Sequence, residues 1–178
     1  MVEADLLEHY RVGIRGFLLS QKDEEIRTTV PEFQSIILEE VLSFAKNEII
    51  GVYNCDKHNL WTHGATKIVT DKIAEANGHI AARLIYVPSG DGYIGAIENL
   101  KGIAMQVPNG VLQNEGLTTF IVVDGKITLA VGDKDDKPLL LFPSGLDGFT
   151  AQALTFASDL WKFTTENSDT NDTERSHE

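Results

Sequence analysis

Apolar residues recur at helical spacing in two segments at the start of the chain. In residues 6–18 they follow intervals of three or four, which predicts an amphipathic helix that ends near the polar stretch at residues 21–25. A second helix is predicted over residues 31–44, because Pro31 suits a first helical turn and the apolar positions after it share one face. Each helix needs a surface that covers its apolar stripe.

Short apolar runs then alternate with further helical patterns. The runs at residues 49–53, 80–87 and 103–107 are typical of buried strands, and the segments at 68–76 and 94–100 between them are helical. An order of strand, helix, strand, helix, strand is typical of a parallel sheet with crossover helices. The sequence therefore predicts an α/β fold.

The pattern changes after residue 117. Residues 118–123 and 126–131 flank Asp124-Gly125, a strong signal for an antiparallel hairpin, and residues 139–142 predict one more strand. A last helix is predicted over 150–163. The expected organisation is an N-terminal helix and linker (1–29), an α/β domain (30–163) and a disordered acidic tail (164–178), since the tail lacks apolar residues.

The order of these elements resembles one half-domain of the phospholipase D family. The phrases that carry the resemblance are Ile37-Leu38-Glu39-Glu40-Val41, Asp71-Lys72-Ile73-Ala74-Glu75-Ala76, Leu100-Lys101-Gly102-Ile103, Phe120-Ile121-Val122-Val123-Asp124-Gly125-Lys126 and Leu160-Trp161. The resemblance as a whole covers roughly residues 31–163. The resemblance implies a phospholipase D-like half-domain with a parallel sheet followed by an antiparallel hairpin.

The signature of that family is a histidine, one residue, a lysine, four residues and an aspartate. With Asp124 as the aspartate, the histidine position falls on Leu117 and the lysine position on Thr119. In the family the histidine takes the phosphoryl group and the lysine holds the phosphate oxygens. Leu117 has no nucleophilic atom and Thr119 no cation, so the resemblance implies a degenerate site without phosphodiesterase activity.

A degenerate half-domain of this kind is similar to the effector-binding domain of TrmB-like transcription regulators, which bind effectors such as sugars. Residues 1–29 are too short for the winged helix of those regulators. The resemblance thus implies a ligand-sensing module without a DNA reader. Phospholipase D halves pair about a two-fold axis, so a homodimer is also implied.

The net charge limits the classes of partner that we expect, and the cysteine content bears on the cellular compartment. The formal net charge of −12 repels phosphate backbones and anionic membrane surfaces, so we expect no direct contact with nucleic acid or membrane. Cys55 is the only cysteine, and residues 1–19 contain charged residues that a signal peptide core excludes. These features favour the cytoplasm.

Polar residues gather after the predicted strands, where the carboxyl ends of a parallel sheet open toward ligands. We therefore expect a small polar ligand, held by hydrogen bonds without cofactor, metal or covalent step, in the crevice between the loops after the first two strands and residues 117–124. The candidate ligand-binding residues are Asn54, Asp56, His58, Ser89, Asp91, Thr118, Thr119 and Asp124.

Three alternatives to this sensor remain open. Cys55, Asp56, His58 and His63 could hold Zn²⁺, although their spacing matches no recurring zinc motif and a polar loop with a buried free cysteine is favoured. The chain could be a phosphodiesterase-like hydrolase with a non-standard site. It could also be a homodimeric assembly module, in which the apolar stripe of the first helix meets a second copy.

Overall fold

The structure is a computed structural model that describes residues 3–55, 61–75, 79–88, 95–100, 102–107, 119–132, 137–145 and 148–174. Its elements, in chain order, are α1 (Ala4–Ser20), β1 (Ile26–Thr28), α2 (Pro31–Ser43), β2 (Glu48–Asn54), α3 (His63–Glu75), β3 (Ala81–Val87), the short 3-10 helix η1 (Gly95–Asn99), β4 (Ala104–Gln106), β5 (Phe120–Val123), β6 (Ile127–Val131), β7 (Leu139–Phe142) and α4 (Phe149–Glu174).

Within the described residues, seven strands form one sheet in the order β1-β7-β6-β5-β2-β3-β4. Strands β2, β3 and β4 run parallel, whereas β5, β6, β7 and β1 are joined by antiparallel pairs. The turn between β5 and β6 contains Asp124 at φ 53° and Gly125 at φ 64°, the left-handed pair that a tight hairpin requires. The predicted parallel sheet followed by an antiparallel hairpin is confirmed.

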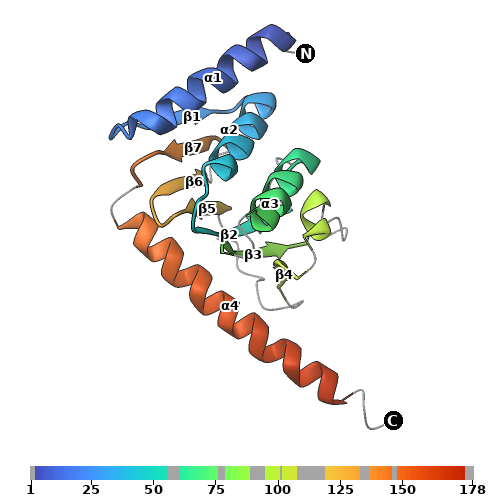
Figure 1. Cartoon of the computed structure of the whole chain (residues 1–178). Helices are drawn as coiled ribbons and strands as arrows, with labels where there is room; N and C mark the ends of the chain where they lie inside the picture. The colour runs from blue at the N-terminus through green and yellow to red at the C-terminus, as the bar shows by residue number, and fades with distance from the viewer. Residues whose placement is uncertain are drawn as a thin grey trace.

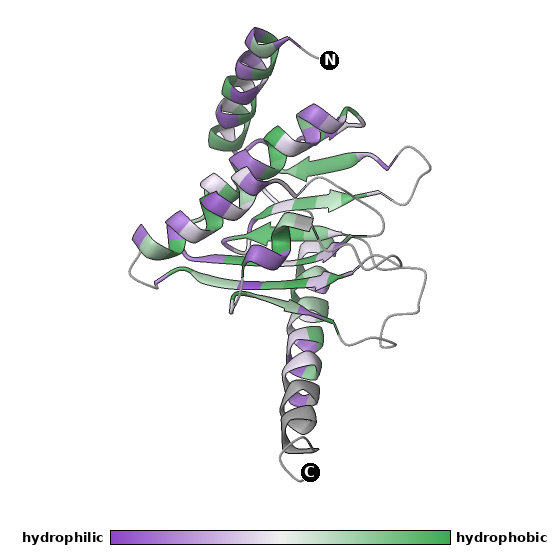
Figure 2. Ribbon diagram, turned by 90° about the vertical axis from the view of Figure 1, so that its right-hand side faces the viewer, coloured by the Kyte–Doolittle hydropathy of each residue, from purple (hydrophilic) through white to green (hydrophobic). Residues whose placement is uncertain are grey.

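Each face of the sheet has its own apolar core. One core lies under α1, α2, α3 and η1, and it contains Leu38 of α2, Val69 of α3 and Ile121 of β5. The other lies under α4, where Ala157 and other small or branched side chains meet β2, β3 and β5. Figures 1 and 2 show the N-terminal helices on one side of the sheet and α4 crossing the other side.

The N-terminal segment is part of this sheet and core. The predicted linker contains β1, which pairs with β7 between Ile26 and Leu141. In α1, Ile14 and Leu18 are each 2% exposed and belong to the core under the N-terminal helices. The C-terminal part of the apolar stripe of the first helix thus packs on its own domain, whereas Leu6 at its start is 51% exposed. Self-association stays a prediction.

The last helix is longer than the sequence predicts. It continues from Phe149 through Glu174, so the predictions of a helix end at residue 163 and of disorder throughout 164–178 are wrong for residues 164–174. No glycine or proline interrupts this stretch, and the Thr164 hydroxyl donates a hydrogen bond to the Leu160 carbonyl at 2.8 Å. Thr164 is buried, so the fold covers the helix at that point.

Candidate functional site

Two of the predicted ligand-binding residues meet at the edge of the sheet where β2 ends. Asn54 is the last residue of β2, and Thr119 immediately precedes β5, the antiparallel neighbour of β2. The backbone N–H of Asn54 donates a hydrogen bond to the Thr119 hydroxyl oxygen at 2.9 Å. Both residues are buried, with Thr119 fully enclosed. This contact fixes the end of β2 against the start of β5.

Asp124 lies at the opposite edge of the sheet. Its carboxylate accepts hydrogen bonds from the backbone N–H groups of Lys46, Asn47 and Glu48 at 3.0, 2.7 and 2.9 Å. These donors precede or begin β2, so the length of that strand, about 20 Å at roughly 3.3 Å per residue, separates Asp124 from Asn54. The predicted crevice cannot include Asp124 together with Asn54 and Thr119.

The remaining predicted ligand-binding residues lie outside the described residues. They are Asp56, His58, Ser89, Asp91 and Thr118. Asp56 and Ser89 follow the ends of β2 and β3 closely in sequence, and these strands pair in parallel from Glu48 with Ala81 to Asn54 with Val87. The chain therefore leaves β2 and β3 at the same edge as Asn54 and Thr119.

Two polar residues at this edge were not predicted. Tyr86, near the end of β3, pairs in register with Tyr53 of β2 and Gln106 of β4, and its hydroxyl donates to the Gln106 Oε1 at 3.5 Å. Burial raises the pKa of Tyr86, and the charges of Glu98 and Cys55 add to that shift. The phenol is protonated at neutral pH, as an ordinary tyrosine is, and the shift extends this state to higher pH. The sequence could have indicated Tyr86, because it lies near the end of a predicted strand that ends at the same edge of the sheet as Asn54.

Comparison with known proteins identifies the fold. No protein-family model and no curated protein sequence matches the chain. Among solved structures, the crystal structure of a phospholipase D family member, Nuc from Salmonella typhimurium, superposes with a TM-score of 0.53 at 11% sequence identity. The match covers 78% of this chain and 93% of that chain. The fold is phospholipase D-like.

Thr119, the residue that the sequence spacing assigns to the lysine position of the signature, is neutral and buried in this phospholipase D-like fold. Thr119 offers a hydroxyl, and the Asn54 N–H already donates to its oxygen. The Thr119 carbonyl in turn accepts a hydrogen bond from the Val131 N–H at 2.9 Å. The hydroxyl and the carbonyl of Thr119 therefore connect it to β2 and β6.

The metal alternative finds no support within the described part of this phospholipase D-like domain. Among those residues, no group of three or more His, Cys, Asp or Glu side chains could hold a metal ion. Cys55 is buried in the core under the N-terminal helices, and His63 is exposed at the first position of α3. Asp56 and His58, the other two candidate ligands, lie outside the described residues.

No helix in the described ranges is long and apolar enough to cross a membrane.

Proposed function

We propose that this chain is a non-catalytic sensor or regulatory domain that binds a small polar molecule at the edge where β2 and β3 end. The observation that carries the proposal is the buried Thr119, whose hydroxyl oxygen accepts the Asn54 backbone N–H; we take Thr119 to stand in place of the signature lysine. A phosphoryl-transfer site needs a cation or strong donors aimed at the phosphate oxygens. A neutral hydroxyl enclosed between two strands supplies neither.

The chemistry of the edge favours hydrogen bonding to a neutral polar ligand such as a sugar. Like any phenol at neutral pH, Tyr86 keeps its proton, so it can donate as well as accept, and burial only raises its pKa further. Gln106 adds an amide beside it. The predicted residues Asp56, His58, Ser89, Asp91 and Thr118 belong to the chain segments that leave this edge, and carboxylates and hydroxyls there would complete a set of partners for ligand hydroxyls.

Two measurements on the full chain test the proposal. Mass spectrometry of small molecules released by denaturing the purified protein should detect a retained polar metabolite. A chromogenic phosphodiester should show no turnover, with or without divalent metal. Turnover that disappears in a His58→Ala variant would overturn the proposal and support the phosphodiesterase-like hydrolase.

Variants at the strand ends locate the site. Tyr86→Phe should reduce the amount of retained metabolite, since it removes the hydroxyl but keeps the ring. Asp124→Asn, at the opposite edge, is the matched control and should retain the metabolite at the native level. Equal loss in both variants would show that retention follows overall stability rather than the proposed edge. Absence of any retained molecule would favour the assembly module.

A further inference from the structure

A cavity lies beside Asp124, at the edge of the sheet opposite to Asn54 and Thr119. It has a volume of about 180 Å³ and lies between the end of α1, the turn from α2 into β2, and the β5–β6 hairpin. Its wall is mainly apolar and includes Leu18, Phe44, Ile127 and Pro143. The cavity is separated from the edge with Asn54 and Thr119 by the length of β2.

Two lysines line this cavity, and neither has a carboxylate partner for its ammonium group among the described residues. Lys46 and Lys126 both line it. The Lys126 ammonium donates to the amide oxygen of Gln21 at 2.7 Å, which is a neutral acceptor. In a chain with a net charge of −12, two lysines beside one small cavity without a carboxylate partner form a local positive site.

Asp124 is the one acidic residue of the cavity lining, and its carboxylate is turned toward the backbone. It accepts three backbone N–H groups from residues 46–48, which orient it toward the backbone without removing its negative charge, so the lining has two positive charges against one negative charge. This arrangement leaves the two lysines to meet a ligand. Gln21 is held in the left-handed conformation at φ 48°, which is uncommon for a residue with a side chain and places it at the cavity where it meets Lys126.

The size of the cavity limits the apolar part of a ligand. An engineered apolar cavity of about 150 Å³ binds benzene, so about 180 Å³ accommodates one aromatic ring or a branched alkyl group of similar volume. An anionic group on that body would reach the lysines at the rim. We propose that this cavity binds a small monocarboxylate whose apolar part is about the size of a benzene ring, at a site distinct from the one proposed above.

Benzoate is the probe, and heteronuclear NMR on the full chain in low-salt buffer is the measurement. Benzoate should shift the amide signals of residues 46–48 and 124–126, with an affinity in the millimolar range expected of so small a ligand. The Lys46→Gln/Lys126→Gln double variant should weaken binding about tenfold, because each exposed ion pair contributes a modest factor. Benzyl alcohol, which keeps the ring but lacks the charge, should bind the native chain about tenfold more weakly as well.

One control variant and one variant of the cavity wall separate binding at this site from general effects of substitution. Lys162→Gln removes one exposed lysine of α4 and should leave benzoate binding unchanged. Leu19 lines the cavity although it is 72% exposed, so Leu19→Ser removes part of the apolar wall without disturbing the core and should weaken benzoate binding. Absent or scattered amide shifts, unchanged binding in the double lysine variant, or equal binding of benzyl alcohol would each overturn the proposal.

Discussion

The Glu40 carboxylate, buried between α1 and α2, accepts two hydrogen bonds from the Arg15 guanidinium at 2.6 and 3.1 Å. Arg11 donates to the same carboxylate at 2.7 Å and to Glu39 at 2.9 Å. The side chain of Glu40 is 2% exposed, whereas those of Arg11 and Arg15 are 25% and 52% exposed. Glu40 is therefore the charged group that needs these hydrogen bonds, because both arginines can still reach water.

Removing the arginines should cost more stability than removing the acid. The Arg11→Ala/Arg15→Ala variant leaves a buried carboxylate without a partner, and we expect it to lose about 3–5 kcal/mol of unfolding free energy. Glu40→Gln leaves two arginines that reach water, so its loss should be smaller, about 1–2 kcal/mol. Urea unfolding measures both, with the exposed Arg83→Ala of β3 as the control. Equal losses would contradict this asymmetry.

Two glycine substitutions should change stability in opposite directions. A Cβ on Gly51 in β2 would lie 2.7 Å from the Phe120 carbonyl oxygen of the neighbouring strand. Gly51→Ala should therefore destabilise the fold by about 2–3 kcal/mol. Gly16 in α1 has nothing within 4 Å of the added atom, so Gly16→Ala should stabilise it by about 0.5–1 kcal/mol through helix propensity.

Thermal unfolding compares these two variants directly. The same added methyl group should lower the stability in one variant and raise it in the other, because its surroundings differ between Gly51 and Gly16. Stabilisation by Gly51→Ala would mean that β2 and β5 lie further apart than described. Loss of stability in Gly16→Ala would mean that α1 is covered on that face.

Neighbouring threonines in α4 should respond differently to a carboxylate. Thr164 is buried and Thr165 is exposed. Thr164→Asp should lower the unfolding free energy by about 3 kcal/mol or more, because the charge loses its hydration. Thr165→Asp should stay within about 0.5 kcal/mol of the native chain, as surface changes usually do. Similar melting temperatures for both variants would show that the fold does not cover α4 at Thr164.

Tyr86 should make stability fall at alkaline pH. Burial, with smaller contributions from Glu98 and Cys55, raises its pKa above the ordinary value of 10.0. The unfolded chain loses the proton first, so the contribution to stability is complete below that ordinary pKa and is lost as pH rises through the higher folded pKa. Urea midpoints from about pH 8 to 11 should fall less in Tyr86→Phe than in the native chain.

Tyr10 provides an internal comparison for this prediction. Burial raises the pKa of Tyr10 too. Its ring, in α1, stacks on the ring of Phe33 in α2 with 4.0 Å between the ring centroids, whereas Tyr86 lies in β3. The effects of Tyr10→Phe and Tyr86→Phe on the alkaline slope should add, because the two phenols are independent. A slope unchanged in the double variant would assign the alkaline loss to other groups.

The sequence predicts those parts of the fold whose pattern is local. The Asp124-Gly125 turn and the strands around it follow from residues adjacent in the chain. β1 was missed because Ile26, Arg27 and Thr28 form a short segment among polar residues, and their strand conformation depends on pairing with β7 more than 100 positions away.

The candidate site could be predicted only in part for a related reason. Asn54 and Thr119 share an edge because β2 and β5 are antiparallel neighbours, and sequence does not reveal which strand the hairpin joins. The same pairing carries Asp124 to the far edge. A residue at the tip of the hairpin therefore could not be assigned to an edge before the register was known.

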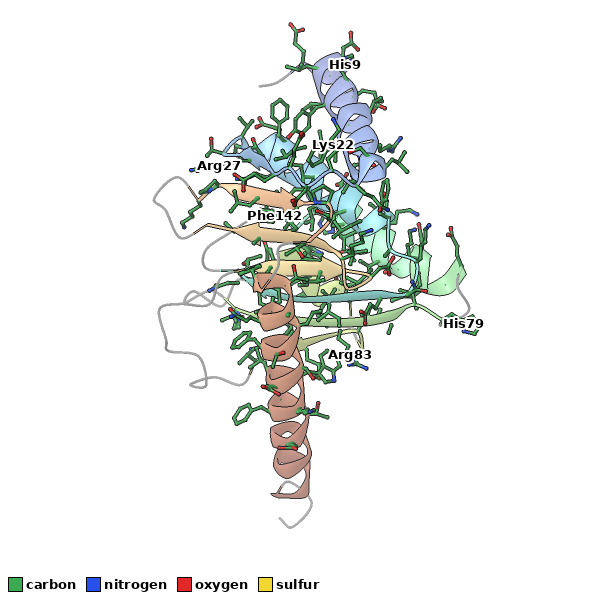
Figure 3. All side chains as sticks on the ribbon, turned by 90° about the vertical axis from the view of Figure 1, so that its left-hand side faces the viewer. His9, Lys22, Arg27, His79, Arg83 and Phe142 are labelled. Carbon is green, nitrogen blue, oxygen red and sulfur yellow. The ribbon has the colours of Figure 1, made fainter. Side chains whose placement is uncertain are left out.

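The two outermost strands of the sheet, β1 and β4, each contain three residues. An unpaired strand edge exposes backbone donors and acceptors that can recruit a strand from another chain, and short edges limit that recruitment. Arg27 in β1 adds an exposed charge to one of them (Figure 3). Short edges therefore disfavour continuous sheet extension, the route to fibrillar aggregation, at both of these strands.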